Sequence, residues 1–260
     1  MELQTGIYQT MSWNERTELL LGAAANARLT GANVMVVGLG GVGAFAAEMI
    51  CRAGIGKMTI VDGDVVEESN RNRQLPALVS TAGEPKTDVL ARRFRDINPL
   101  IDLTVINEFL RDERTQQLLD SQSYDYVLDC IDTLSPKVFL IAHAVQRGLK
   151  VVSSMGAGGK VDPSRVKVAD LSKSHDCKLA RMVRKRLHRM GIYKGVTVVF
   201  SPEEVPEEAL RLESSQNKNS TVGTISYMPA VFGCFMASVV IRELADSAPA
   251  TGNEAAPDNV

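Results

Sequence analysis

The sequence lacks paired cysteines. Its four cysteines lie far apart, and no CxxC pair occurs among them: Cys51, Cys130, Cys177 and Cys234. This spacing suits neither a zinc knuckle nor a disulfide framework, so we expect reduced thiols. Cys234 lies within the mostly apolar final helix that we expect near the C-terminus, and there we expect it to be a small core residue.

Long apolar runs and clustered histidines are absent too. No apolar run reaches the length needed to cross a bilayer, and residues 1–16 contain no hydrophobic signal core. We therefore expect a cytoplasmic protein without a transmembrane segment. The three histidines do not cluster in the sequence, so we assign neither a metal site nor a histidine base: His143, His175 and His188.

The net charge is also small. A formal charge of −2 over 260 residues gives no overall attraction to nucleic acid or to a membrane. Any such contact must therefore come from a local patch. The chain length suits one large α/β domain, because a second full domain would be cramped.

What is present is a nucleotide-binding pattern between Val34 and Asp62. The run Val34–Val37 is apolar and β-branched, as expected for a strand that is buried on both faces. Asp62 ends the next strand, at the spacing where a carboxylate accepts hydrogen bonds from ribose hydroxyls. Four glycines follow the first strand, where backbone without a Cβ turns tightly and a helix start faces a phosphate: Gly38, Gly40, Gly41 and Gly43. Together these features predict a ribonucleotide pocket.

Strand and helix signals continue to alternate after this unit. This alternation is typical of the α/β class, with a Rossmann-like, doubly wound and mostly parallel sheet. The expected helices are Glu84–Ile97, Asp112–Leu119 and Pro136–Arg147, and the expected strands are Leu103–Ile106, Tyr124–Cys130 and Val151–Ser154.

The character of the sequence changes after Gly159. We expect a basic helix at Lys178–Met190, a strand at Val196–Phe200 and an apolar closing helix at Met228–Leu244. The second half is interpreted as an insertion that covers the edge of the sheet. The expected organisation is one domain over residues 1–245, with an N-terminal arm (1–30), a basic crossover insertion (172–222) and a disordered tail (246–260).

The loop after Asp62 distinguishes this chain from an ordinary NAD-binding protein. An arginine and a lysine near the glycine turn suit a triphosphate, because they neutralise the charge that grows on a leaving pyrophosphate. Hydride transfer has no such need. Asp129 and Asp132 are expected at the same rim of the sheet, where one of them could hold a magnesium ion between phosphates. The loop and the helix after it carry these polar groups: Asp64, Asn70, Arg71, Asn72, Arg73, Gln74 and Lys86.

On these motifs the sequence resembles the adenylyltransferases related to the ubiquitin-activating enzyme, the ThiF, MoeB and HesA superfamily, over nearly the whole chain. GLGGVG matches the family's glycine turn, and Asp62 matches its ribose-binding acid. The matches to its NxxRQ element, phosphate lysine and magnesium-binding aspartate are Asn70, Arg73, Gln74, Lys86 and Asp132. Arg16 matches an arginine that reaches into the partner subunit's ATP site.

The resemblance implies a homodimer that uses ATP and Mg²⁺ to activate a substrate carboxylate as an acyl-adenylate, with AMP and pyrophosphate as products. The residues implied in catalysis are Arg73, Lys86, Asp132 and Arg16, with Asp132 as the metal ligand. The residues implied in nucleotide binding are Gly38, Gly40, Gly41, Gly43, Asp62, Asp64, Asn70, Arg73, Gln74 and Lys86.

The second half is similar to one branch of that superfamily, the tRNA threonylcarbamoyladenosine dehydratases. The similar stretches are SSMGAGGKVDPSRVKVADLSKSHDCKLARMVRKRLHRMGI, VVFSPE and VGTISYMPAVFG. Enzymes of this branch adenylate the carboxylate of the threonylcarbamoyl group beside the tRNA anticodon, and a nitrogen of that group then displaces AMP to close a ring. The branch implies a tRNA substrate, with a cysteine-desulfurase-linked sulfur acceptor protein as a further candidate partner. Some members have a cysteine before the final helix, where this chain reads NKNSTVGTIS.

The basic segment supports that branch on physical grounds. Seven basic residues and no acid occur between Lys178 and Lys194. In a chain of small net charge this concentration predicts a local phosphate-binding surface, although a solvated helix face is the alternative. The residues we assign to tRNA binding are Lys178, Arg181, Arg184, Lys185 and Arg189.

Two other functions remain open from the sequence. An activator of a ubiquitin-like sulfur-carrier protein would share the ATP site, but such activators usually carry paired zinc cysteines. A non-catalytic NAD-dependent regulator would leave Arg73, Lys86 and Asp132 unexplained.

Overall fold

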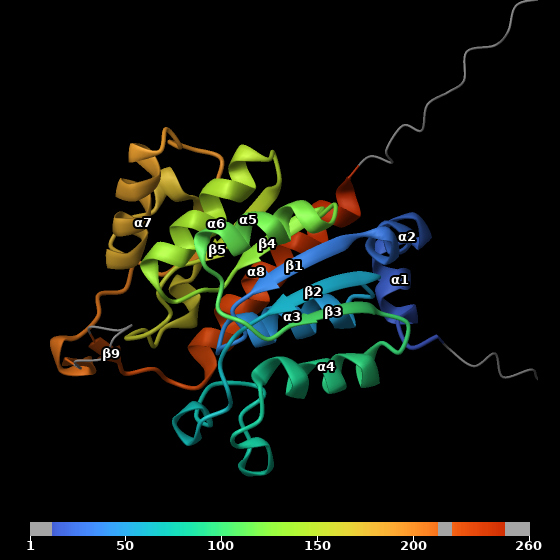
Figure 1. Ribbon diagram of the computed structural model, residues 1–260, viewed down its shortest axis with the longest axis horizontal. Helices are drawn as coiled ribbons and strands as arrows, with labels where there is room; N and C mark the ends of the chain where they lie inside the picture. The colour runs from blue at the N-terminus through green and yellow to red at the C-terminus, as the bar shows by residue number, and fades with distance from the viewer. Residues whose placement is uncertain (1–11, 213–219, 248–260) are drawn as a thin grey trace, which may run out of the picture.

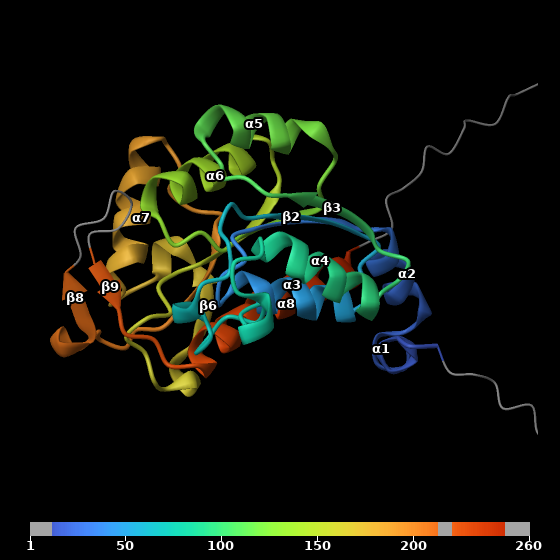
Figure 2. The same cartoon turned by 60° about the horizontal axis from the view of Figure 1, so that its bottom comes forward.

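The computed structural model describes residues 12–212 and 220–247 of the chain. A seven-stranded sheet runs through the molecule, with helices on both faces (Figures 1 and 2). Its strands are β1 (Asn33–Val37), β2 (Lys57–Val61), β3 (Asp102–Ile106), β4 (Tyr126–Asp129), β5 (Lys150–Ser154), β6 (Lys167–Asp170) and β7 (Thr197–Phe200). They lie in the order β3-β2-β1-β4-β5-β7-β6, and only the β6–β7 pair is antiparallel. The predicted α/β class and doubly wound, mostly parallel sheet are confirmed.

The strand β1 lies inside the sheet between β2 and β4, and its five residues are all buried. The chain passes from β1 to β2 on one side, and it later adds β4 on the other side of β1. In an open α/β sheet, the crevice at the carboxyl ends of the strands lies where the strand order reverses in this way. The topology therefore places the glycine turn after β1 and the loop after β4 at one crevice.

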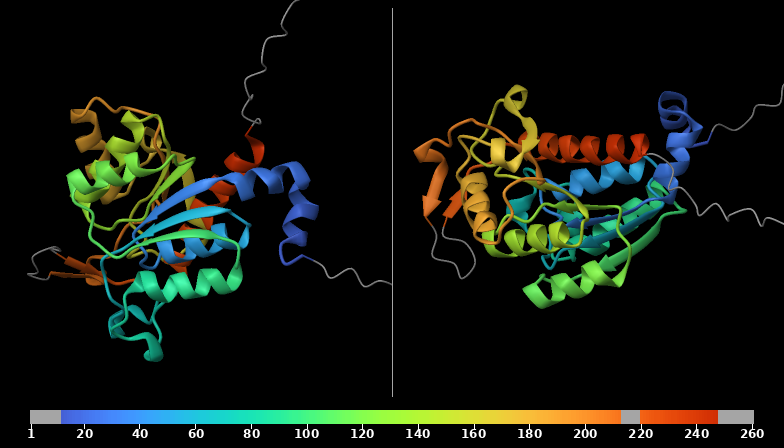
Figure 3. Two further views of the ribbon diagram at one scale, coloured as in Figure 1. Left: turned by 45° about the vertical axis from the view of Figure 1, so that its right-hand side comes forward. Right: turned by 90° about the horizontal axis from the view of Figure 1, so that it is seen from above.

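Helices cover the two faces of the sheet in two groups. On one face lie α3 (Gly43–Arg52), α4 (Lys86–Ile97) and α8 (Tyr227–Asp246), whose buried apolar residues form one core cluster. On the other face lie α5 (Asp112–Ser121), α6 (Leu134–Gln146) and α7 (Lys178–Arg189), which share a second cluster. Figure 3 shows α8 and α5 on opposite sides of the sheet. The helices and strands predicted between Val34 and Ser154 are confirmed, with ends shifted by one or two residues.

The closing helix α8 is apolar on the side that faces α3. A Cβ on Gly233 would lie 2.5 Å from the carbonyl oxygen of Val42, so the two helices approach closely. By length and composition α8 is the one described helix that could span a membrane, but its buried side is part of the core. The prediction that Cys234 is a core residue is wrong, because Cys234 lies on the opposite side of α8 and is exposed.

The second half extends the sheet instead of covering its edge. β7 pairs with β5, and β6 then pairs with β7 as the edge strand. The run Val198–Phe200 is almost completely buried, which explains why it joins the sheet. A short hairpin that the sequence did not reveal, β8 (Leu210–Leu212) with β9 (Ser220–Val222), lies beyond it. The predicted tail after Ser247 lies outside the described residues.

The N-terminal arm contains two short helices, α1 (Glu15–Leu21) and α2 (Ala23–Gly31). Figure 1 shows both beside the amino ends of the central strands, away from the crevice. Trp13, Leu19 and Leu20 are 48%, 75% and 82% exposed, so this arm presents apolar side chains to the outside.

Candidate functional site

Three separate segments meet at the glycine turn. A Cβ on Gly38 would lie 2.8 Å from the carbonyl oxygen of Cys130, which belongs to the loop after β4. A Cβ on Gly41 would lie 2.8 Å from Pro229 at the start of α8 and 3.2 Å from the carbonyl oxygen of Arg73. Both positions therefore require glycine for packing. The turn contacts the loop after β4, the loop after β2 and the first turn of α8.

Gly40 differs from the other glycines of the turn. A Cβ on Gly43 would clash with the carbonyl oxygen of Gly38 at 1.7 Å, whereas the nearest atom to a Cβ on Gly40 is Gln74 Nε2 at 3.8 Å. Internal packing therefore explains Gly43 and does not explain Gly40. A ligand that approaches the backbone closely would explain it, as a phosphate does at the start of a helix.

Asp62 is held against the same turn. Its Oδ2 accepts a hydrogen bond from the Leu39 N–H at 2.6 Å, and its Oδ1 accepts one from the Asp64 N–H at 2.7 Å. Burial raises the pKa of Asp62 above its ordinary value, while the nearby Lys86 and these two N–H groups oppose the rise. The carboxylate thus has a fixed place at the carboxyl end of β2, where a ribose-binding acid is expected.

Lys86 opens α4 and reaches back to the crevice. Its side chain is only 5% exposed, and its Nζ lies 2.8 Å from Oδ2 of Asp64, which is 53% exposed. The Lys86 N–H also donates to the Asp64 carbonyl oxygen at 3.1 Å. The ammonium group therefore has one accessible anionic partner, which a phosphate group could replace.

The predicted NxxRQ element forms a tight loop beside the turn. Asn70 is 7% exposed, and its Oδ1 accepts a hydrogen bond from the Glu67 N–H at 3.2 Å, so this side chain shapes the loop. Arg73 donates from Nη1 to the Ser69 carbonyl oxygen at 2.9 Å. Gln74 Oε1 is buried without a hydrogen-bond partner in the described part of the chain. A bound nucleotide is one way to satisfy this amide beside Gly40.

The two aspartates at the end of β4 have different environments. Asp129 is fully buried, and its oxygens accept hydrogen bonds from Lys137, Ser153 and the Ile131 N–H. It cannot also face a metal ion in the crevice. Asp132 is exposed in the same loop, two residues beyond the Cys130 carbonyl that packs on the glycine turn. Asp132 is therefore the more accessible of the two carboxylates.

Within the described residues no three histidine, cysteine or carboxylate side chains cluster as a metal site. This arrangement still fits magnesium, because Mg²⁺ is commonly held by one or two carboxylates together with substrate phosphates and water.

Arg16 lies far from the crevice of its own chain. Asn14, two residues before Arg16, lies beside Gly54. Its Nδ2 is 3.3 Å from the position that a Cβ on Gly54 would occupy. Gly54 follows α3, and the ten residues of that helix separate it from the glycine turn by about 15 Å. An arginine side chain spans only roughly 7 Å. The structure therefore does not bring Arg16 together with the other predicted site residues of the same chain.

The basic helix α7 presents most of its charge outward. Four of the five residues assigned to tRNA binding are exposed, and their side chains make no hydrogen bond or ion pair with other described residues: Lys178, Arg181, Lys185 and Arg189. Arg184 is different, because its Nη1 donates to the carbonyl oxygens of Leu171 and Ser174 at 3.1 and 2.8 Å. Its position beside the buried face of α7 explains this inward role.

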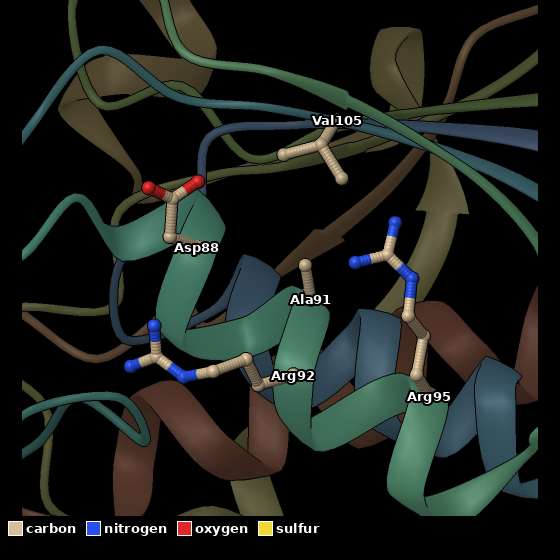
Figure 4. A pocket seen from close by; sticks show the side chains of 5 residues that line it. All are labelled: Asp88, Ala91, Arg92, Arg95 and Val105. Atoms are coloured by element: carbon tan, nitrogen blue, oxygen red, sulfur yellow. The ribbon is translucent and has the colours of Figure 1, made fainter.

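A hollow of about 350 Å³ lies between α4 and β3, outside the crevice. Figure 4 shows its lining, in which Arg92 and Arg95 point in different directions: Asp88, Ala91, Arg92, Arg95 and Val105. None of the predicted site residues lines it, so we assign the nucleotide to the crevice and not to this hollow.

Comparisons with known proteins agree with this geometry. A model of the ThiF family matches residues 15–257 of the chain. The chain belongs to the ThiF family. A relative from Bacillus subtilis, a tRNA threonylcarbamoyladenosine dehydratase, is 38% identical over 237 residues, which cover 88% of this chain and 93% of the relative. The Escherichia coli enzyme of the same name is 40% identical over 202 residues, which cover 74% of this chain and 75% of that enzyme.

A solved structure shares the fold. The crystal structure of the Escherichia coli tRNA N6-threonylcarbamoyladenosine dehydratase in complex with ATP matches with a TM-score of 0.80 and 34% identity, covering 89% of this chain and 93% of that one. A protein with this architecture therefore binds ATP.

Sequence reasoning missed two contacts near Asp132. Lys137, in α6, forms the buried ion pair with Asp129. Arg186, in α7, donates to Ser135 Oγ at 2.8 Å, which joins the basic helix to the start of α6. The sequence offered one signal for the pair of Asp129 and Lys137, because Asp129 lies at the end of a predicted strand and Lys137 lies at the start of the predicted helix after it. Nothing in the sequence indicated the hydrogen bond between Arg186 and Ser135.

Proposed function

We propose that this protein is an ATP-dependent tRNA threonylcarbamoyladenosine dehydratase. The observation that carries the proposal is the assembly at the switch point of the sheet, where the glycine turn contacts the loops that bear Arg73 and Asp132. A triphosphate needs backbone N–H groups, cations and a metal-binding carboxylate at one place, and these loops supply all three. The similarity to dehydratases over most of the chain selects the substrate.

The reaction would proceed in two displacements. The threonyl carboxylate attacks the α-phosphorus of ATP, the bond to the bridging oxygen breaks, and pyrophosphate leaves. A nitrogen of the same threonylcarbamoyl group then attacks the acyl carbon, AMP leaves, and a ring closes with loss of the nitrogen's proton. Arg73 and Lys86 would stabilise charge on the phosphates, and Asp62 would hold the ribose. Mg²⁺ held by Asp132 would neutralise phosphate charge.

The tRNA would lie along α7. This helix lies beside α6, and a hydrogen bond from Arg186 to Ser135 joins it to the start of α6. Its four outward cations would contact phosphates of the anticodon stem while the modified adenosine enters the crevice. Arg184 is left out of this surface, because its guanidinium is bonded within the chain.

The active enzyme would be a homodimer with shared sites. Arg16 cannot reach the crevice of its own chain. Helical spacing puts Leu19 and Leu20 on the same side of α1 as Arg16, and Trp13 lies two residues before the helix. These apolar side chains are exposed. Burying them against a second copy would bring Arg16 to the partner's ATP site.

The proposal also includes a cytoplasmic location, which cell fractionation would test. It further includes a sulfur acceptor protein linked to cysteine desulfurase as a partner, which affinity capture would test.

Pyrophosphate release tests the proposed activity. We expect release from ATP that depends on tRNA carrying threonylcarbamoyladenosine, and mass spectrometry should detect the dehydrated nucleoside in the product. Release that depends instead on a ubiquitin-like sulfur-carrier protein would identify a carrier activator. No release with either substrate would favour a non-catalytic nucleotide-binding protein.

A further inference from the structure

A fully buried ion pair lies under the loop that carries Asp132. Lys137 Nζ and Asp129 Oδ2 are 2.6 Å apart, and both side chains are 0% exposed. The pair lies where β4 ends, β5 ends and α6 begins, three elements that are neighbours in Figure 1. Burying two charges is costly, and an apolar pair of similar size is often as stable or more so. Stability alone is therefore a weak explanation for it.

The hydrogen bonds of this pair join all three elements. Lys137, from α6, also donates to Ser153 Oγ at 3.2 Å and to the Ser154 carbonyl oxygen at 2.9 Å, both at the end of β5. Ser153 in turn donates to Asp129 Oδ2 at 2.5 Å. The four side-chain bonds therefore form one connected cluster between two neighbouring strands and the helix that follows the loop.

The cluster reaches the loop itself through Asp129. Asp129 Oδ1 accepts a hydrogen bond from the Ile131 N–H at 3.1 Å, which fixes the backbone one residue before Asp132. The same stretch packs on the glycine turn, since a Cβ on Gly38 would lie 3.1 Å from the Ile131 nitrogen. The position of Asp132 relative to the phosphate-binding turn therefore depends on this cluster.

We propose that Lys137 is a positioning residue, which acts through Asp129 and Ser153 to hold the Asp132 loop against the glycine turn. Lys137 is too deeply buried to touch the substrate. Its effect is on the geometry of a group that does, and a displacement of about 1 Å at such a group can lower a rate by about a hundredfold. The inference about catalysis rests on the proposed function, whereas the inference about loop order does not.

An apolar replacement of the whole cluster separates positioning from stability. The variant Asp129→Val/Lys137→Met/Ser153→Ala removes every charge of the cluster, so it leaves no buried ion unpaired. We expect it to fold with a Tm near that of the wild type and to bind ATP with an affinity within about threefold, while kcat for AMP release falls by about a hundredfold. A folded variant whose kcat stays within about threefold of wild type would overturn the proposal.

Hydrogen–deuterium exchange tests the loop without using activity. We expect faster exchange in peptides that cover residues 130–136 of the apolar variant, and unchanged exchange in α8, which is the internal control. Unchanged exchange in residues 130–136 would overturn the proposal as well. If the wild-type protein releases no AMP with tRNA, the proposed function fails, but this exchange experiment still decides whether the cluster orders the loop.

A milder variant covers the case in which the apolar variant does not fold. Ser153→Ala keeps the ion pair and removes only the hydroxyl that bridges it to β5. We expect kcat to fall by about three- to tenfold with little change in the affinity for ATP, and exchange in residues 130–136 to rise. Wild-type values for both kcat and exchange would exclude a positioning role.

Discussion

Two lysines beside the crevice form similar ion pairs in different surroundings. Lys86 pairs with Asp64 at 2.8 Å, and Lys137 pairs with Asp129 at 2.6 Å. The partner of Lys86 is 53% exposed, whereas the partner of Lys137 is completely buried. A ligand can therefore compete for the first lysine and cannot reach the second.

The same contrast occurs on α7. Arg184 is bonded to backbone carbonyl groups of its own chain, while its neighbour Lys185 is exposed. The first comparison has the same residue type at two places in the chain, and the second has two adjacent basic residues. What separates a charge that acts on a ligand from one that holds the fold is whether its bonding capacity is already used inside the chain.

The largest expected effect is on stability, and it would distinguish the two lysines. Lys137→Met leaves Asp129 buried without a cationic partner, which should lower the free energy of unfolding by about 3–5 kcal/mol. Lys86→Met leaves a half-exposed carboxylate, so the loss should be no more than about 1 kcal/mol. Urea unfolding of both variants measures the difference. Equal decreases in the free energy of unfolding would show that the exposure of the carboxylate does not determine how much each ion pair stabilises the fold.

The second expected effect is on the rate of AMP formation, and here the variant of Lys86 should show a large change. Arg73→Ala, Lys86→Met and Asp132→Ala should each lower the rate of AMP formation by about a hundred- to a thousandfold with the fold intact, because we propose that each of these side chains acts on the charge that develops on the phosphates. Arg92→Ala is the matched control, since Arg92 is exposed on α4 outside the crevice and should leave the rate near that of wild type. Near-normal turnover in a folded Asp132 variant would remove it from the site.

Much of the fold follows from patterns that the sequence shows directly. The buried β1, the glycine turn and Asp62 lie at fixed spacings, because a tight turn and a parallel sheet allow few alternatives. The second half was less predictable, since β7 and β6 extend the sheet through pairing that is distant in sequence. Sequence patterns report local periodicity and not which strand becomes a neighbour.

The sequence predicted which residue types form the candidate site, but it could not predict which of their side chains are hydrogen-bonded within the chain. Strand spacing alone left Asp129 and Asp132 open as the metal ligand, and the family resemblance pointed to Asp132. The structure is consistent with that assignment, because the oxygens of Asp129 are bonded within the chain whereas Asp132 is exposed. Cys234 shows the opposite limit: it lies in an apolar helix, yet its side of that helix is exposed.

A third prediction extends the comparison to Arg16, an exposed charge that makes no hydrogen bond or ion pair with the other described residues. If it completes the partner's site, the Arg16→Ala and Asp132→Ala enzymes should each be inactive, and mixed dimers should regain activity. Random reassociation gives one intact site in half of the dimers, so we expect about a quarter of wild-type activity. Confirmed heterodimers without recovery would show that Arg16 does not act across subunits.

The smallest expected effect is on tRNA binding, where α7 offers its own control. Lys185→Gln with Arg189→Gln removes two outward cations, which should weaken tRNA binding by about tenfold and lower the slope of log K against log salt by about 1 to 2. Arg184→Gln should leave that slope unchanged and lower the Tm instead, because it breaks hydrogen bonds to Leu171 and Ser174. Binding measured at several salt concentrations gives both quantities. If Arg184→Gln lowers the slope as much as the outward pair does, then hydrogen bonds inside the chain do not keep a cation from the nucleic acid. Hydrogen bonding within the chain would then not separate the cations of α7 that bind nucleic acid from those that do not.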